Sequence, residues 1–476
     1  MKKMNQFMMG MLAIAATAFT SCSNEDGLGG NGQTSRESVE NFYMKLQITG
    51  NSENGTRTDG KPTESATKEE STIKSGTIWL VSPDGSVAFS KKLSTVDWDD
   101  TSNKTSKPIK VAVTQVDEGV KYKVYFLANK ADNTINLTKS PTEQEFTSST
   151  GGADFAKDNA FVMFNQNDKT VKADQYLVEF KAENKDEAHP AKPTNPIKLD
   201  RVTARIDYST SATIINKEQR KNDKTENIEA IQKVNFLSFA PFNVTNKENM
   251  MQQWDANWTI MTLPNDLGTL YCPKNRFITG RQIAANVPTQ WFDKKTYIFE
   301  NTQDDTASAT GVFLKYKAVA ETSANKDFAD STFYRYDKHV FTSIQDIIKF
   351  TGAANPFGSL TADQVVDLIK GEPTAEDPTK FNLTTDETKI AKFRTDYNIE
   401  VFERGEVYYT YYIEDIHHTG KKYSVLRNSI YRLKVNNIFD LGSDTPDEPK
   451  IEPNYYLDVE VTVNPWVLNN LEIDLK

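Results

Sequence analysis

The amino-acid sequence predicts a mainly β fold, built from β-sandwich domains with a few short helices on their loops. Short runs of alternating apolar and polar residues, rich in Val, Ile, Tyr, Phe and Thr, recur along most of the chain. Clusters of Gly, Asn, Asp and Pro separate many of these runs, as turns separate the strands of a sandwich. Helical periodicity is rare between them.

Twelve runs carry the strand pattern. The predicted strands are 43–49, 76–82, 110–116, 122–129, 175–180, 202–209, 233–240, 295–300, 311–320, 406–414, 429–438 and 457–463. The best helix candidate is 360–371, in which Thr361 can cap the first turn and Gln364 completes a capping box. Gly371 is expected to end that helix.

Length and composition limit the possible classes of protein. A chain of 476 residues is long enough for two or three domains, and the polar run 216–227 is the best candidate for a boundary between them. The net charge of −10 and the scattered lysines argue against a nucleic-acid partner, because an acidic surface repels phosphate. We therefore expect an acidic, exported protein.

The first residues have the pattern of a secretory signal. Two early lysines precede an apolar stretch over 7–19, which is too short for a membrane-spanning helix of about 20 residues. Two small residues follow, and Cys22 comes directly after them. We expect a lipoprotein signal over 1–21, with a lipid on the Cys22 thiol. A plain secretory signal with an incidental cysteine is the alternative.

The sequence offers no pattern for a metal, a cofactor or catalysis. Only Cys22 and Cys272 are cysteines, so no disulfide framework and no zinc cluster are expected. The adjacent pair His417 and His418 lies in a turn-like stretch, and "DWDD" at 97–100 lacks the glycine of a calcium loop. Nucleotide-binding and hydrolase motifs are missing as well. We expect a non-enzymatic protein without metal or cofactor.

The polar segment 51–74, "NSENGTRTDGKPTESATKEESTIK", carries one arginine, Arg57, among small polar residues. Exposed tips of this composition are where proteases cut a chain. The segment is either an ordinary polar loop or a processing site. Which of the two applies depends on the strands on either side.

Four stretches resemble the fimbrillin family, the shaft subunits of type V pili. They are "PIKLDRVTARIDY" (196–208), "TYIFENTQDDT" (296–306), "YSVLRNSIYRLKVNNIFDLG" (423–442) and "LDVEVTVNPWVLNNLEIDL" (457–475). Their order and spacing resemble the family over nearly the whole chain, as do the lipoprotein signal and the linker arginine. The "ENT" and "VLRN" stretches are closer to the minor-fimbria branch than to the major one.

The resemblance implies two tandem transthyretin-like β-sandwich domains after a removable leader. The expected limits are 1–21 for the signal, 22–57 for the leader, 58–218 for the first domain and 219–476 for the second. It also implies a lipidated precursor at the outer membrane, a trypsin-like protease that removes the leader after a basic residue, and export to a surface fimbria. The expected partners are further copies of this chain and the anchor and tip subunits of the same pilus.

The strand before Arg57 fits this scheme. Met44, Leu46 and Ile48 point to one face, which indicates a half-buried strand. A cut between Arg57 and Thr58 separates that strand from the fold and opens an apolar groove with unpaired edges. Lys61 and Lys68 are rival cutting sites if the protease accepts lysine.

The last residues of the sequence provide a candidate donor strand. After the alternation of 457–463 and the Pro465–Trp466 pair, a second apolar series follows, made of Val467, Leu471, Ile473 and Leu475. These residues can fill the groove of a neighbouring copy. The alternative is that 467–475 is the last strand of its own domain.

Other functions remain open. A glycan-binding surface lipoprotein would need exposed aromatic platforms, for which Trp254, Trp258 and Trp291 are the candidates. An anchor or tip subunit of the same pilus is a closer alternative, and a hydrolase is the most remote.

Overall fold

The structure is a computed structural model that describes part of the chain. For residues 64, 65, 210 and 457–467 it describes the backbone alone, and for the rest side chains as well. The described residues are 40–49, 64–99, 105–130, 132–169, 171–210, 213–218, 225–265, 267, 290–304, 306–415, 418, 420–446 and 457–467. All of them belong to one compact unit, Glu40–Lys476.

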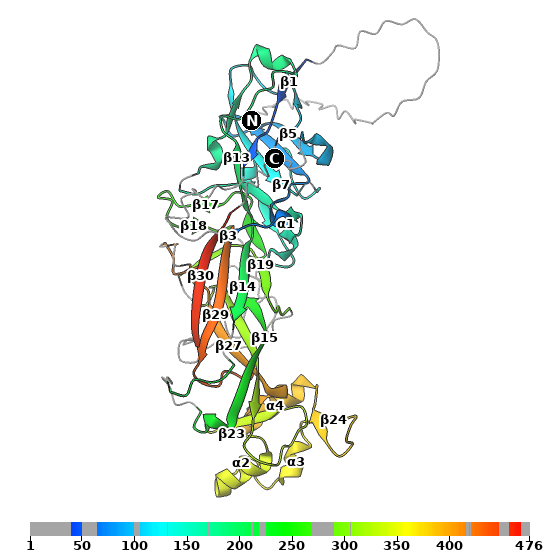
Figure 1. The fold of residues 1–476 in the computed structure, drawn as a ribbon, viewed down its shortest axis with the longest axis vertical. Helices are drawn as coiled ribbons and strands as arrows, with labels where there is room; N and C mark the ends of the chain where they lie inside the picture. Colours follow the sequence, from blue (N-terminus) through cyan, green and yellow to red (C-terminus); the bar gives the residue numbers. More distant parts are fainter. Residues whose placement is uncertain are drawn as a thin grey trace, which may run out of the picture. The chain divides into compact units, whose positions relative to one another are not determined.

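The N-terminal part is a β-sandwich built around a seven-stranded sheet (Figure 1). In order across the sheet, its strands are β2 (Ile48–Thr49), β13 (Ile197–Arg201), β11 (Met163–Asn165), β7 (Lys121–Ala128), β4 (Gly76–Val81) and β5 (Val87–Leu93), with β12 (Leu177–Glu179) also paired to β7. A second layer pairs β1 (Asn41–Met44) with β6 (Ile109–Ala112).

Strand β4 shows that this sheet is covered on both faces. Every residue of β4 is buried. Ile78 and Leu80 pack into the cluster that β1 and β6 cover, while Trp79 and Val81 pack into a second cluster on the other face. A strand buried on both sides reads as a continuous apolar run rather than a strict alternation.

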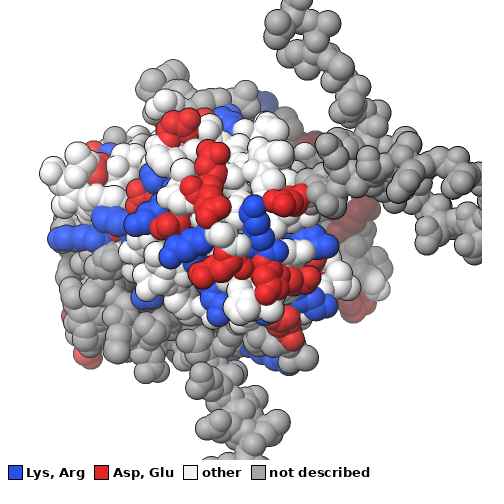
Figure 2. Space-filling model, turned by 90° about the horizontal axis from the view of Figure 1, so that it is seen from above, with Lys and Arg blue, Asp and Glu red and all other residues white. Residues whose placement is uncertain are grey.

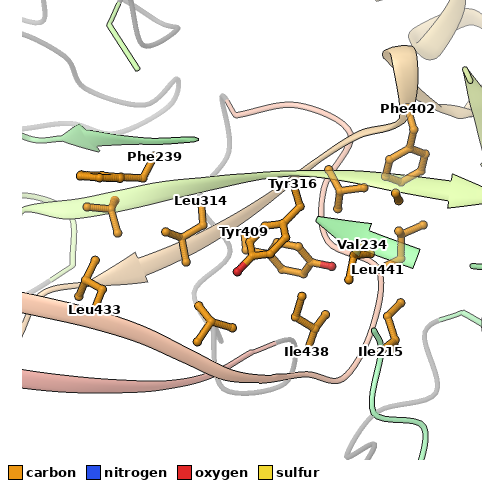
Figure 3. Packing of buried hydrophobic residues seen from close by; sticks show 14 of the residues in the cluster. Ile215, Val234, Phe239, Leu314, Tyr316, Phe402, Tyr409, Leu433, Ile438 and Leu441 are labelled. Carbon is orange, nitrogen blue, oxygen red and sulfur yellow. The ribbon is translucent and has the colours of Figure 1, made fainter. Parts of the chain in front are cut away.

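The C-terminal part is a second sandwich. Its first sheet contains, in order, β19 (Lys295–Ile298), β14 (Ala204–Thr210), β29 (Ser429–Ile438), β30 (Leu457–Val467) and β3 (Glu64–Ser65). Its second sheet contains β15 (Ile231–Phe242), β21 (Gly311–Ala320) and β27 (Glu406–Tyr412). Figure 3 shows the core between them, where Leu314, Tyr316 and Tyr409 of one sheet face Leu433 and Ile438 of the other.

Residues 321–405, between β21 and β27, form an insertion with its own apolar core. The insertion contains β22 (Phe333–Tyr336), β23 (His339–Phe341), α2 (Ile344–Thr351), α3 (Ala362–Val366), β24 (Lys370–Pro373), β25 (Phe381–Leu383), α4 (Glu387–Tyr397) and β26 (Glu400–Phe402). None of the helices in the described part of the chain is long and apolar enough to cross a membrane.

The remaining elements are short. They are α1 (Lys68–Ser71), the strand pairs β8 (Glu145–Thr147) with β16 (Lys247–Asn249), β9 (Ala156–Lys157) with β10 (Ala160–Phe161), β17 (Gln253–Trp254) with β18 (Met261–Thr262) and β20 (Asn301–Gln303) with β28 (Tyr423–Val425), and the 3-10 turns Thr95–Asp97, Pro141–Glu143, Ala153–Phe155, Ala173–Gln175, Ala182–Lys185, Ile228–Ala230, Gly352–Ala354 and Glu403–Gly405.

The mainly β prediction is confirmed, and each of the twelve predicted strands overlaps a strand of the structure. Two details were wrong. The helix predicted over 360–371 has its Thr361 capping box but ends at Val366, and Gly371 lies in β24, where a Cβ would stand 2.7 Å from the carbonyl oxygen of Leu383. The last strand runs through Pro465 to Val467 instead of ending at 463.

The change from one sandwich to the other falls between β13 and β14. Strand β13 pairs within the seven-stranded sheet, whereas β14 pairs with β19 and β29. The expected domain limits at 218 and 219 stay a prediction, but strand pairing changes sheet at residues 202–203, earlier in the chain. Residues 219–224 lie outside the described part.

Candidate functional site

Residues 40–49 form an extended segment that lies between two strands of the N-terminal sandwich. On one side β1 pairs antiparallel with β6, and on the other side β2 pairs parallel with β13. The side chains alternate strictly between buried and half-buried over 41–49. This confirms that the segment is a half-buried strand; its regular strand geometry is interrupted at 45–46, although backbone hydrogen bonds continue there.

Backbone hydrogen bonds hold both edges of the segment. On the first edge, Ser106 N–H donates to the carbonyl oxygen of Leu46 at 3.1 Å. On the second edge, Ala191 N–H donates to the carbonyl oxygen of Tyr43 at 2.8 Å, and Ile197 N–H donates to that of Gln47 at 2.7 Å. Removing the segment therefore leaves unpaired groups on two strand edges, a state that favours pairing with another strand.

Four side chains of the segment fill the core of the sandwich. Met44, Leu46 and Ile48, the residues singled out from the sequence, are 0%, 0% and 5% exposed. Phe42 is buried as well, with its ring centroid 5.2 Å from that of Phe180. Sequence reasoning missed Phe42 because the predicted strand began at residue 43. Extending the same alternation by one step would have found it.

The exposed side of the segment carries two ion pairs. Lys45 Nζ lies 2.6 Å from Asp99 Oδ2, and Lys185 Nζ lies 2.8 Å from Glu40 Oε2. The hydrogen bond between the second pair lowers the pKa of the Glu40 carboxyl and raises the pKa of the Lys185 ammonium group. Water screens exposed pairs of this kind, so the buried side chains dominate the attachment.

The end of β30 defines the candidate donor region. Strand β30 pairs antiparallel with β29 along nearly its whole length, from Leu457 opposite Ile438 to Pro465 opposite Ser429. On its other edge β30 pairs parallel with β3, where Ser65 lies opposite Val467. Val467 is thus the last described residue of a strand in its own sheet.

Several residues predicted from the sequence lie outside the described part of the chain. They are Cys22, Arg57, Thr58, Lys61, Cys272, His417, Leu471, Ile473 and Leu475. Their proposed roles in lipidation, processing and donation stay predictions. The rival cutting site Lys68 is described, and it is the first residue of the capped turn α1.

The three tryptophans considered as glycan platforms pack against their own chain. The indole N–H of Trp254 donates to the carbonyl oxygen of Asn167 at 2.7 Å. Trp291 lies under the Lys315 ammonium group at 4.2 Å from the ring centroid, and Trp258 lies under that of Lys172. Each is half-buried, and these contacts use part of the surface that a sugar would need.

Charged side chains of both signs are mixed on the surface. Figure 2 shows Lys and Arg interspersed with Asp and Glu on the visible face, without a large area of one sign. Within the described residues, no group of three or more His, Cys, Asp or Glu side chains could hold a metal ion. The candidate site is the inserted strand and the apolar groove that it fills.

Comparison with known families identifies the chain. The model of the major fimbrial subunit protein FimA matches residues 43–201, and that of the C-terminal region of fimbrillin, the major fimbrial subunit protein type IV, matches residues 400–472. The chain belongs to the fimbrillin family. Members of this family are structural subunits of cell-surface fimbriae rather than enzymes, and they polymerise and associate with other fimbrial components.

Three solved structures that the chain resembles come from Porphyromonas gingivalis and Bacteroides eggerthii. A fimbrilin from Porphyromonas gingivalis W83 is 13% identical with a TM-score of 0.47, covering 91% of this chain and 99% of that one. A protein from Bacteroides eggerthii DSM 20697, named for cell adhesion, is 12% identical with a TM-score of 0.47, covering 90% and 97%. The C-terminally truncated tip fimbrial protein Mfa3 from Porphyromonas gingivalis is 12% identical with a TM-score of 0.33, covering 90% and 100%. No curated protein matches the chain.

The limits of the two family matches show which parts of the fold they include. The first match starts at residue 43, so it includes most of the inserted strand. The second match covers β26, β27, β28, β29 and β30. Neither match reaches residues 202–399, which contain most of the insertion. Neither separates the minor-fimbria branch, favoured by the sequence resemblance, from the major one.

Proposed function

We propose that this fimbrillin is a shaft subunit that polymerises by strand exchange after a protease has removed its leader. The observation that carries the proposal is the inserted strand over 40–49. It fills an apolar groove and is hydrogen-bonded along both edges. The predicted cut after Arg57 lies between this strand and the rest of the fold.

The inserted strand accounts for why the uncut precursor stays monomeric. Burying four large apolar side chains contributes about 6–12 kcal/mol at about 1.5–3 kcal/mol each. That is comparable with the net stability of a whole domain, about 5–15 kcal/mol. An empty groove is therefore strongly unfavourable, and a strand of matching pattern from another copy is expected to fill it once the leader has left.

The donor strand of the proposal is the C-terminal segment after β30. Its apolar residues Leu471, Ile473 and Leu475 alternate with polar ones, as Met44, Leu46 and Ile48 do in the leader. A strand added between two open edges gains main-chain hydrogen bonds and fills alternate pockets. The contact is head-to-tail, so it need not close into a ring and can extend into a fibre.

Export and anchoring complete the proposal. The signal over 1–21 and the lipid on Cys22 hold the precursor at the outer membrane. A trypsin-like protease then releases the mature subunit, which begins at Thr58. The assembled fimbria reaches the cell surface and supports adhesion, together with the anchor and tip subunits.

Replacing Arg57 tests the proposal. Arg57→Ala should keep the inserted strand in its groove, so the protein folds, resists removal of its leader and stays monomeric. Lys61→Ala serves as the matched control and should process and polymerise normally. The measurements are N-terminal sequencing after treatment with trypsin and electron microscopy of the products. Fibres from uncut Arg57→Ala protein, or a wild-type product that starts beyond residue 75, would contradict the proposal.

A further inference from the structure

The eight residues 64–71, called here the clamp segment, follow the predicted cutting site and connect the two sandwiches. Its first two residues form β3, which pairs with the end of β30. Thr67 then caps α1, with its backbone N–H bonded to the Glu70 carboxylate at 3.0 Å. The next strand of the chain, β4, belongs to the N-terminal sheet.

Glu70 anchors the clamp segment in the interior. The residue is only 3% exposed, although its side chain carries a carboxylate. One carboxylate oxygen accepts a hydrogen bond from Arg205 Nη1 at 3.1 Å, and the backbone carbonyl oxygen accepts one from Arg201 Nε at 3.0 Å. Both arginines are buried, Arg201 completely. Arg205 also donates to the Asp207 carboxylate through Nε and Nη2, at 2.8 Å each. Losing the Glu70 carboxylate is still costly, because it removes buried hydrogen bonds from the Arg205 guanidinium and from the Thr67 backbone N–H.

The hydrogen bonds around Glu70 continue through Arg201 to the C-terminal sheet. Arg201 Nη1 also donates to Asn428 Oδ1 at 3.1 Å, and Asn428 directly precedes β29. Ala66 of the clamp segment is buried together with Phe161 and Ile430, which come from the two sandwiches. The clamp segment therefore has buried contacts on both sides, unlike a linker.

We propose that the clamp segment stays in place after processing and sets two limits. The first is on cutting, which does not pass residue 63. The second is on the donated strand, which begins at Leu468 because the clamp segment holds the end of β30. This inference rests on the proposed function. Lys68 lies in a capped turn with the buried Glu70 two residues on, so the peptide bond after it is not available in extended form to a protease. The pairing of Ser65 with Val467 fixes the last residue of β30.

Limited digestion with trypsin tests the first limit. In Arg57→Ala/Lys61→Ala protein, both predicted sites between the inserted strand and the clamp segment are gone, and we expect Lys68 to stay uncut. Adding Glu70→Ala should open the turn and raise the rate of cutting after Lys68 by about 100-fold or more. Adding Glu69→Ala instead is the matched control, because Glu69 is an exposed neighbour in the same turn. Rapid cutting after Lys68 without Glu70→Ala, or equal rates for the two added variants, would overturn the inference.

A disulfide tests the second limit without weakening the clamp. Ser65→Cys/Val467→Cys places two cysteines on paired residues of adjacent strands, within the reach of a disulfide. After the cut at Arg57, oxidised and reduced protein should polymerise equally, since the donated strand begins after the bridge. Polymerisation of the reduced protein alone would overturn the inference. If neither form polymerises, the proposed function fails, and the digestion experiment still decides on the clamp.

Discussion

At the scale of single residues, Leu46 and Leu80 lie in the same core but on opposite sides of the proposed cut. Both are fully buried leucines of the same apolar cluster. Leu46 lies in the inserted strand, on the side of the predicted cut that is removed. Leu80 lies in β4, on the side that remains.

This difference yields a prediction. Leu46→Ala should lower the free energy of unfolding of the precursor by about 2–5 kcal/mol, because it leaves a cavity in the core. The mature polymer should be unaffected, since the strand that carries Leu46 has left. The measurements are urea unfolding of the precursor and heat dissociation of the polymer on a gel.

Leu80→Ala is the matched control and should weaken precursor and polymer alike. A polymer that dissociates more readily with Leu46→Ala than in the wild type would show that the leader strand remains in the assembled protein.

At the scale of elements, the pairing of β30 sets where the proposed donor strand can begin. Strand β30 pairs with β29 over most of its length and with β3 at its end. Arginine side chains also hold residues 441–444, which come before β30. Arg394 Nε lies 2.6 Å from Asp444 Oδ2, and Arg335 pairs with Glu400 and donates to the carbonyl oxygen of Leu441 at 3.0 Å. We infer that β30 belongs permanently to its own subunit.

The corresponding prediction concerns removal of 468–476. The truncated protein should fold and stay monomeric after the cut at Arg57, because it keeps β30 but lacks a strand to donate. Light scattering after processing measures the assembly, and circular dichroism verifies the fold. Adding a peptide of sequence "LNNLEIDLK" should stabilise the open groove. Fibres from the truncated protein would refute donation, and a protein that no longer folds would favour 467–475 as a strand of its own domain.

At the scale of the whole molecule, the chain is a fimbrial subunit that must first be exported. The family matches reach both sandwiches, one over residues 43–201 and the other over 400–472. If the subunits join head to tail, as we propose, the polymer has no fixed end, so assembly needs a control on when it starts. In our proposal, the lipid on Cys22 and the leader strand supply that control.

Replacing Cys22 tests the anchoring step. Cys22→Ser should shift the precursor from the membrane fraction to the soluble fraction or leave it incompletely processed, because a thiol is needed to carry the lipid. Immunoblots of the two fractions measure the distribution. Cys272→Ser is the control and should leave it unchanged. Wild-type amounts of Cys22→Ser protein in the membrane fraction would remove the lipoprotein assignment.

The sequence by itself determined the class of the fold, the positions of twelve strands and three of the four buried leader residues. These features follow from alternation of side chains, which depends only on the local geometry of an extended chain. The stretches around Arg201, Glu300 and Arg427 also indicate the fimbrillin family by their residues alone.

Only the tertiary structure decided which of these pieces meet. Arg427 donates to the carboxylate of Glu300, 127 positions away, and both are buried, although charged residues in a sequence suggest a surface. Likewise, Glu70 in a polar linker is the anchor of the clamp segment, and the strand over 40–49 pairs with β6 and β13. Pairing between distant segments depends on how the whole chain closes its loops and buries the apolar faces of its strands. A local sequence pattern does not specify these long-range contacts.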